Sequence, residues 1–431
     1  MSDIQRDDFK TIASWCLFDW ANSAFTTLVV TFIYATYFSS AFAPDEVTGT
    51  ALWSRGVGLS AVIIALLSPV LGAAADKGGK RKRYLAVTTM TAVIATTLLT
   101  FITPSMPNAV FLALGLFVVG NVGFELGMVF YNSFLPAIAS PARIGRVSGY
   151  GWGVGYVGGL VCLVVALVAF VQPETPWFGI GKAEIFNIRA TNLLVAVWFA
   201  IFSLPLFLFV RERPVPGVRF DLAGTLRELK DTVRHVRRYG EIVKYLIAHL
   251  VYNDGLVTVF AFGAIYAAGT FGMSFSEVIL FGIVLNVVAG LGALGFGFVD
   301  DRIGGKKTVM ITLVALSVAT LIGVLAPTKT WLWVAGVLIG AFGGPNQAAS
   351  RSLMGRFSPQ RHQTEFFGFY ALSGKVTSFM GPIALGTVAQ LAGTQRAGIA
   401  TVIAFFVVGG VLLAWVNEGR GIEAARAADA A

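Results

Sequence analysis

The sequence is poor in charged side chains. Lys, Arg, Asp and Glu make up 13% of the 431 residues, whereas a soluble globular domain usually carries about 25%. The apolar residues occur in long runs such as 195–210 and 397–415, and a run of about 20 apolar residues matches the thickness of a bilayer. This shortage of charge excludes an ordinary water-soluble fold and predicts an all-α membrane protein.

Cysteine, histidine and nucleotide-binding motifs are also scarce. The two cysteines, Cys16 and Cys162, lie in apolar segments and the three histidines are scattered, so no spacing suits a metal site. A Walker loop, which would cradle a nucleotide, is absent from the sequence. We therefore expect no enzyme activity, no cofactor and no metal.

Twelve apolar segments are long enough to cross a bilayer as helices, because a membrane-spanning strand would need only about 10 residues. They are expected near residues 13–38, 54–75, 84–103, 108–132, 147–171, 190–210, 243–267, 277–299, 307–326, 330–350, 366–391 and 397–416. The polar stretch 211–242 divides them six and six, and its leucines and valines recur at helical spacing. The sequence predicts two six-helix bundles, 1–210 and 243–431, joined by a linker with an amphipathic helix on the membrane surface.

Positive charge is distributed unevenly between the two sides of the membrane. Of the 32 Lys and Arg residues, 26 fall in segments on the side of the N-terminus, 5 fall on the other side, and Lys375 lies within a span. Cytoplasmic loops are enriched in Lys and Arg, so we expect a multi-pass protein of the cell inner (plasma) membrane with both termini cytoplasmic. This distribution also accounts for the net charge of +9 without a nucleic-acid partner. We expect a monomer surrounded by lipid.

The two predicted halves carry a similar loop. Gly-x-x-x-Asp followed by a basic residue, glycine and a basic pair occurs after the second span and after the eighth, with the two aspartates 225 residues apart. Glycine permits close helix approach, and the aspartate can cap the N-terminus of the next helix and pair with cations of the other half. We expect these loops to hold one face of the bundle closed; a tight turn that only fixes topology is the alternative. The candidate gating residues are Gly72, Asp76, Gly79, Lys80 and Arg81 in the first loop and Gly297, Asp301, Arg302 and Lys306 in the second.

This doubled loop resembles the signature loop of the major facilitator superfamily of membrane transporters. The octapeptide FDWANSAF at 18–25, the sequence YNDG at 252–255 and the segment 343–352 resemble, more narrowly, the autophagy-related vacuolar effluxer-like family. The resemblance covers the whole chain and implies a twelve-helix transporter of two pseudo-symmetric halves that works by alternating access. Fungal vacuolar members of that family are linked to export of amino acids. Span 5 is similar to a glycine-rich antiporter motif, but Tyr156 replaces its proline, so the resemblance does not extend to antiport.

Ionisable side chains inside spans are costly, so each is a candidate functional residue. Asp19, Glu125 and Asp254 are candidate proton carriers or substrate ligands, with structural pairing between helices as the alternative role. Lys375 is expected either to bind a substrate carboxylate or to pair with Glu125 or Asp254. Arg351, at the end of span 10, is expected to stay near the membrane surface. Polar residues expected to line the same cavity are Asn22, Ser23, Asn121, Asn253, Asn346 and Gln347.

These residues favour a carrier for a small zwitterionic solute, such as an amino acid, coupled to protons. A zwitterion needs one acid and one cation close together, and the spans supply both. Two alternatives stay open. The 13% aromatic content is compatible with transport of lipids or amphipathic drugs, and a membrane receptor or scaffold without solute flux is the third interpretation.

Overall fold

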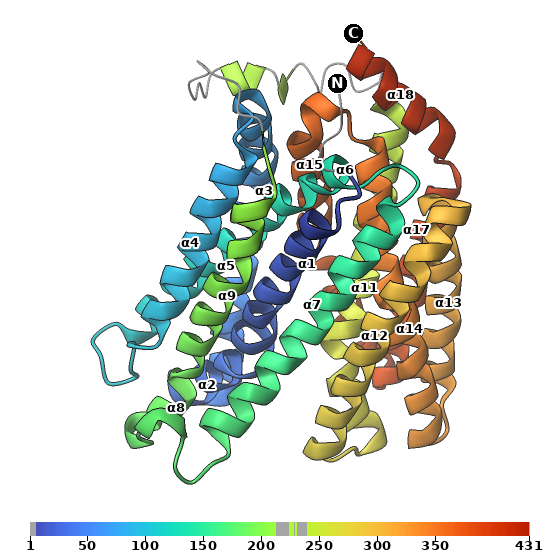
Figure 1. The fold of residues 1–431 in the computed structure, drawn as a ribbon. Coiled ribbons are helices and arrows are strands. Elements are labelled where there is room, and N and C mark those ends of the chain that lie inside the picture. Colours follow the sequence, from blue (N-terminus) through green and yellow to red (C-terminus); the bar gives the residue numbers. More distant parts are fainter. Residues whose placement is uncertain (1–5, 213–223, 228, 231–238, 431) are drawn as a thin grey trace.

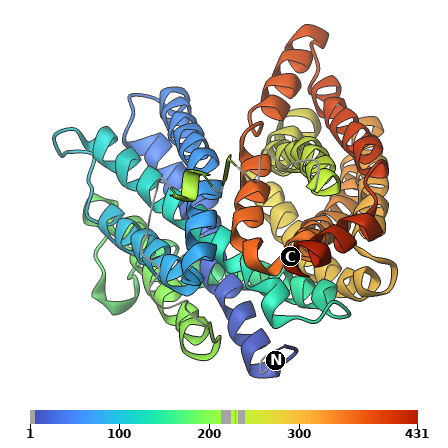
Figure 2. The same ribbon diagram turned by 90° about the horizontal axis from the view of Figure 1, so that it is seen from above.

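The structure is a computed structural model that describes residues 6–212, 224–227, 229–230 and 239–430. These residues form helices and turns, with no strand among them. Both ends of the chain lie at the same end of the helical bundle (Figure 1), which we call the terminal face. Seen from above, the helices form two groups side by side, one blue to green and the other yellow to red (Figure 2).

The first group contains six membrane-crossing units. The first unit is interrupted, since the π-helical segment η1 (Phe25–Phe32) separates α1 (Phe9–Ala24) from α2 (Tyr34–Ala41). The others are α3 (Glu46–Gly78), α4 (Arg81–Leu99), α5 (Ala109–Ser133), α7 (Ile144–Ala166) with η2 (Leu167–Val171), and α9 (Thr191–Phe209); the short helices α6 (Leu135–Ile138) and α8 (Phe186–Arg189) precede α7 and α9.

The second group repeats this arrangement. Its units are α11 (Gly240–Phe271), α12 (Phe275–Ile303), α13 (Gly305–Leu325), α14 (Lys329–Phe357), the pair α15 (Gln363–Lys375) and α16 (Met380–Ala392), and α17 (Gln395–Ala414). A thirteen-residue helix, α18 (Glu418–Ala430), follows the last span and lies over the terminal face (Figure 1).

The twelve predicted spans each coincide with one of these units, which confirms the predicted fold class. Nine helical stretches of the described chain are long and apolar enough, by length and composition, to cross a membrane. The other three units are α4, α14 and the α15–α16 pair. The last of these is interrupted at 376–379, so the prediction of one continuous helix over 366–391 was wrong.

Helix ends follow ordinary capping chemistry. Asp8 and Asp45 each accept a hydrogen bond from a backbone N–H three residues ahead, at 2.8 and 2.9 Å, and so cap α1 and α3. Gly79 ends α3 in the left-handed region, with φ of 54°. Of the predicted linker helix, residues 224–227 and 229–230 are helical, and the rest lies outside the described residues.

The buried apolar side chains form separate clusters in the two groups of helices. One cluster of buried side chains extends from Trp15 to Val210, and two others lie almost entirely between Ile242 and Val416. Each half therefore has its own hydrophobic core, and the contacts between the halves are of a different kind, since many of them are polar.

Candidate functional site

The aspartates of the two repeated loops each cap a helix of the opposite half. Asp76 accepts hydrogen bonds from the Thr364 hydroxyl (2.7 Å) and the Glu365 N–H (2.8 Å), in the first turn of α15. Asp301 accepts from the N–H groups of Gly145 (2.8 Å) and Arg146 (3.3 Å), in the first turn of α7. A carboxylate at a helix N-terminus is favoured by both hydrogen bonding and the helix dipole. We call this reciprocal pair of caps the latch.

The glycines of the same loops allow the latch to close. A Cβ added at Gly72 would lie 2.4 Å from the backbone oxygen of Thr364, and one at Gly297 would lie 2.7 Å from the Cα of Arg146. Both distances are shorter than van der Waals contact. Each loop thus brings a glycine against the helix that its aspartate caps, and any side chain there would push the two halves apart.

The basic residues of the two loops differ in whether they contact the opposite half. Arg81 donates to Gln363 of the opposite half at 2.7 Å and to the Ser133 carbonyl at 3.0 Å. Arg146 of α7 adds an ion pair with Asp301 at 2.5 Å. Gly79 and Lys80 form the turn after α3, and Arg302 is exposed. Lys306 contacts the C-terminal segment of its own half rather than the opposite half.

A second symmetric contact was not predicted. The Lys82 N–H donates to Glu212 (2.8 Å) while its ammonium donates to the carbonyl of Val210 (2.7 Å). In the other half the Lys306 N–H donates to Glu418 (3.1 Å) and its ammonium to the carbonyl of Ala414 (2.9 Å). Each half therefore ties the segment after its last span to the start of its third span. We call these contacts the two anchors.

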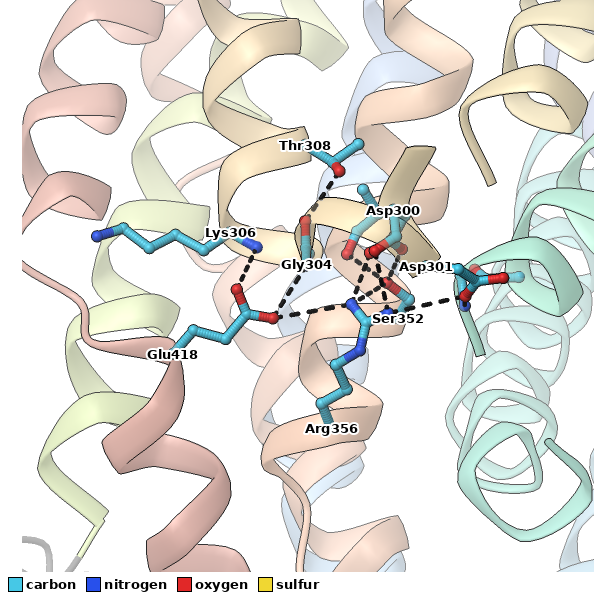
Figure 3. Close-up of polar contacts among 12 residues, drawn as sticks. Asp300, Asp301, Gly304, Lys306, Thr308, Ser352, Arg356 and Glu418 are labelled. Carbon is cyan, nitrogen blue, oxygen red and sulfur yellow. Dashed lines mark hydrogen bonds and ion pairs between the residues drawn. The ribbon is translucent and has the colours of Figure 1, made fainter. Parts of the chain in front are cut away.

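The C-terminal anchor is connected to the latch through Arg356 of α14 (Figure 3). The guanidinium donates to Asp300 at 2.6 Å and lies 3.8 Å from Glu418 and 3.9 Å from Asp301. Asp300 also accepts a very short hydrogen bond from Ser352. Because Asp300 and Asp301 are adjacent, one face of this cluster binds the C-terminal helix and the other binds α7 of the opposite half.

Arg351 is buried between the halves, so the expectation that it stays near the membrane surface was wrong. Its side chain is 2% exposed. It extends from α14 into the first half, donating to Asp19 at 3.0 Å, Asn132 at 3.2 Å and both the hydroxyl (3.0 Å) and carbonyl (2.7 Å) of Ser148. Aromatic rings enclose the guanidinium, with its carbon 4.8, 5.8 and 5.5 Å from the ring centroids of Trp15, Tyr131 and Trp152.

The predicted polar face of α1 adjoins this arginine. Asp19 is its ion-pair partner, with Asn22 3.5 Å from the other carboxylate oxygen. Gly151 of the glycine-rich α7 leaves room for the pair, because a Cβ there would lie 2.7 Å from both the guanidinium and the carboxylate. Ser23 lies beside the same helix, against Gly155. The glycines that resemble an antiporter motif therefore have a packing function here.

Glu125 and Lys375 form an ion pair across the halves at 2.6 Å, one of the two pairings considered for Lys375. Glu125 belongs to α5 and Lys375 is the last residue of α15. Asn121, one turn from Glu125, is 7% exposed. In contrast to the arginine pair, this ion pair is open, with 22% of the Glu125 side chain and 31% of the Lys375 side chain exposed.

Two adjacent residues of α11 hold the interruption in span 11. The Asn253 amide donates to the carbonyl of Gly374, near the end of α15, at 3.3 Å. Asp254 accepts from the Gly381 N–H, in the first turn of α16, at 3.0 Å. Its other oxygen is buried and has no hydrogen-bond partner in the described part of the chain. A discontinuous helix with charged residues at the break is a common feature of transporter binding sites.

The remaining two predicted cavity residues lie on α14. Gln347 accepts a hydrogen bond from the Tyr156 hydroxyl of the opposite half at 2.7 Å. Asn346 is 1% exposed and donates to Thr312 of its own half at 2.9 Å. The structure thus places Gln347 between the halves and Asn346 inside one.

Across residues 6–212 and 239–430, we find no group of three His, Cys, Asp or Glu that could hold a metal ion.

The polar contacts between the halves lie in the part of the bundle that is nearest to the terminal face. The latch lies at the terminal face, with Arg351 deeper. Tyr156 and Lys375 each lie 12 residues from the start of their helices, which corresponds to about 18 Å at 1.5 Å per residue. The hydrogen bonds and ion pairs that join the halves, among the described residues, therefore extend from the terminal face to about mid-helix.

The sequence of this chain is similar to those of known membrane transporters and of one protein family. A family model described as "Vacuole effluxer Atg22 like" matches residues 41–426. The chain is 30% identical to the "Uncharacterized MFS-type transporter YxiO" of Bacillus subtilis, over 94% of each chain. It is 23% identical to "Autophagy-related protein 22-1" of Penicillium rubens, covering 84% of this chain and 74% of the relative.

Solved structures share the fold at low sequence identity. The proton:xylose symporter XylE superposes with a TM-score of 0.73 at 14% identity, covering 97% of both chains. The transporter FucP, solved in an outward conformation, superposes with a TM-score of 0.77 at 12% identity, covering 94% of this chain and 98% of that chain. Both are described as members of the major facilitator superfamily (MFS).

Proposed function

This chain belongs to the Atg22-like vacuole effluxer family of MFS transporters, and from that premise we propose that it carries amino acids across the membrane by proton-coupled alternating access. We also propose that its functional units are the bundles 1–210 and 243–431 with the linker 211–242 between them. The observation that carries the proposal is the reciprocal latch, in which Asp76 and Asp301 each cap a helix of the opposite half.

The latch supports alternating access because it can open while each core stays almost entirely intact. Its members lie at helix ends, and each half keeps its own apolar cluster. Opening the terminal face requires the loss of the two caps and of the contacts that Arg81, Arg146 and Arg351 make with the opposite half. These contacts are polar and can be exchanged for water, so the closed face is stable but reversible.

Asp254 is the proposed proton carrier. Asp19 and Glu125 each form an ion pair with a cation of the opposite half, at 3.0 and 2.6 Å. Asp254 has no Lys or Arg within 4.0 Å among the residues that the structure describes, and one of its oxygens has no partner. A proton on that oxygen would neutralise a buried charge, and release of the proton would follow when the site opens to the other side.

The distribution of Lys and Arg supports an orientation with both termini in the cytoplasm. With the terminal face cytoplasmic, the arrangement described above is closed toward the cytoplasm, in the plasma membrane of a bacterium. The family resemblance supports amino acids as the cargo. A proton or solute gradient would supply the driving force, since the sequence carries no nucleotide-binding motif.

Uptake of pooled, labelled amino acids into proteoliposomes, with and without an imposed pH gradient, tests the proposal. We expect uptake that rises with the gradient in the wild type and that becomes independent of it in Asp254→Asn. Asp429→Asn, at the far end of α18, is a control that should keep the gradient dependence. Uptake no greater than in empty liposomes under both conditions would exclude amino acids and direct the search to lipids, amphipathic drugs or a partner protein.

A further inference from the structure

The ion pair between Glu125 and Lys375 differs from the other charge contacts that join the halves. Arg351 donates to four acceptors, and Asp301 accepts from two backbone N–H groups and a guanidinium. Lys375 donates to one oxygen of Glu125, and the other oxygen of Glu125 has no hydrogen bond to any described residue. An ammonium has three donors and a carboxylate has about four acceptor sites, so most of the bonding capacity of this pair is unused.

The position of the pair indicates that its exposed part faces a space between the halves. Glu125 lies eight residues before the end of α5 and Lys375 lies twelve residues into α15, which places both well inside the membrane. A charged group exposed to lipid at this depth would be very costly. Residues that keep 22% and 31% exposure and bridge two bundles must therefore face an interior that admits water.

The surroundings are those of a ligand site rather than of a packing contact. Lys375 ends α15, where the next four residues leave the helix, and a helix C-terminus favours a cation. Met128, one turn from Glu125, accepts a hydrogen bond from Asn22 of α1 at 3.2 Å. A residue of α1 thus contacts α5 within one turn of the pair.

We propose that an α-amino acid binds between Glu125 and Lys375 as a zwitterion, its ammonium pairing with Glu125 and its carboxylate with Lys375. This inference rests on the proposed transport function and assigns the substrate class to a site. Binding exchanges one ion pair for two, so no charge is left without a partner in the interior. Because the two residues belong to opposite halves, the bound substrate also becomes part of the contact between them.

The proposal predicts a strict requirement for both charged groups of the substrate. An amine without the carboxylate would leave Lys375 unpaired, and a carboxylate without the ammonium would leave Glu125 unpaired. Loss of one member of a buried charge pair weakens binding by on the order of 100-fold. Alanine, leucine and phenylalanine should therefore bind, whereas ethylamine, 3-methylbutylamine and phenethylamine, and the deaminated acids propionate, 4-methylpentanoate and 3-phenylpropionate, should not.

Binding to the purified full-length protein in detergent tests the inference by calorimetry, without transport. In Glu125→Gln, Lys375 keeps its charge, so we expect the deaminated acids to bind at least as well as the amino acids. In Lys375→Gln, Glu125 keeps its charge, so we expect the amines to bind instead. This opposite change in specificity would not result from a purely structural ion pair. Glu277→Gln, which removes an exposed ion pair with Lys329 at 2.9 Å, should leave amino acid binding unchanged.

Two further variants keep the test decisive if a single variant fails to fold. The double variant Glu125→Gln/Lys375→Gln leaves no charge at the site and should lose amino acid binding, whereas the exchange Glu125→Lys/Lys375→Glu should keep it. Unchanged amino acid affinity in the double variant would overturn the inference. If that variant still transports amino acids with an unaltered KM, the inference fails while the proposed function stands; if amino acids bind as described but are not transported, the proposed function fails while the site stands.

Discussion

Arg351 Nη1 lies 3.0 Å from Asp19 Oδ2, and this contact joins α14 to α1 through two side chains that are 2% and 7% exposed. A buried charge that loses its partner costs about 3–5 kcal/mol. In this protein the cost applies to the state closed at the terminal face, because an opened interface would hydrate both groups. The pair is therefore a determinant of the equilibrium between closed and open states.

Removing one member of that pair should open the terminal face. We expect Asp19→Asn and Arg351→Gln to shift the population toward a longer distance between spin labels at Arg143→Cys and Arg361→Cys, two exposed positions on opposite halves. Pulsed electron paramagnetic resonance measures this distance, and the two native cysteines are buried. Lys329→Gln, which removes an exposed ion pair, is the matched control. An unchanged distance distribution in both interface variants would contradict the role assigned to the pair.

Replacing Gly72 or Gly297 by alanine should also open the terminal face, because the added methyl group would clash with the opposite half. The added Cβ would lie 2.4 Å from Thr364 O or 2.7 Å from Arg146 Cα, so the halves must separate for either to fit. Gly58 and Gly295, on the same two helices, have no atom within 4 Å of an added Cβ. Alanine there should leave the label distance unchanged and stabilise the helix by up to about 1 kcal/mol. Equal behaviour of all four variants would refute the steric argument.

The C-terminal anchor should contribute to the stability of its half. Glu418 accepts from the N–H groups of Gly305 and Lys306 at the start of α13, and loss of such a cap costs about 0.5–2 kcal/mol. We expect Glu418→Ala to lower the Tm of the detergent-solubilised protein. Glu423→Ala, at an exposed position of the same helix, is the control and should have little effect. A similar Tm for both variants would argue against the anchor.

The first anchor should respond to pH through Glu212. Burial raises the pKa of the Glu212 carboxyl above its ordinary value of 4.5, although the Lys82 N–H and the Arg81 guanidinium act in the opposite direction. In the window above pH 4.5 the folded protein holds a proton that the unfolded chain has released. The contribution of this group to the free energy of unfolding is therefore present below pH 4.5 and is lost as the pH rises through the raised pKa.

Thermal unfolding of the wild type and Glu212→Gln across pH 4.5 to 8 measures this contribution by difference. The Tm of the wild type relative to that of the variant should fall as the pH rises through the window and become constant above it. A relative Tm that rises with pH would show that the favourable contacts with Lys82 and Arg81 outweigh burial.

The sequence identified the spans and the latch for reasons that are local or repeated. Span length follows from bilayer thickness, and the loop around Asp76 recurs around Asp301 at the equivalent place in the second half. The burial of Arg351 could not be predicted in this way, because it depends on aromatic rings from three helices of the other half, distant along the chain. Position along α14 alone suggested a membrane-surface residue.

The anchors were missed because their sequence signal is weak. Val210-Arg-Glu212 and Trp415-Val-Asn-Glu418 share little beyond a glutamate that soon follows the last span of each half. A lysine at the start of the third span, Lys82 or Lys306, is the other part of the signal. The interruption of span 11 was missed for a related reason, since the residues that hold it, Asn253 and Asp254, belong to span 7.

The duplicated anchors bear on how the chain can be assembled. Glu212 and Glu418 each secure the last span of their own half to the third span of that half, so neither half depends on the covalent connection between them for this contact. A polypeptide cut between residues 213 and 238 would keep both anchors and every residue of the latch. We expect two separately synthesised six-helix pieces to find each other in the bilayer and to reconstitute a working carrier.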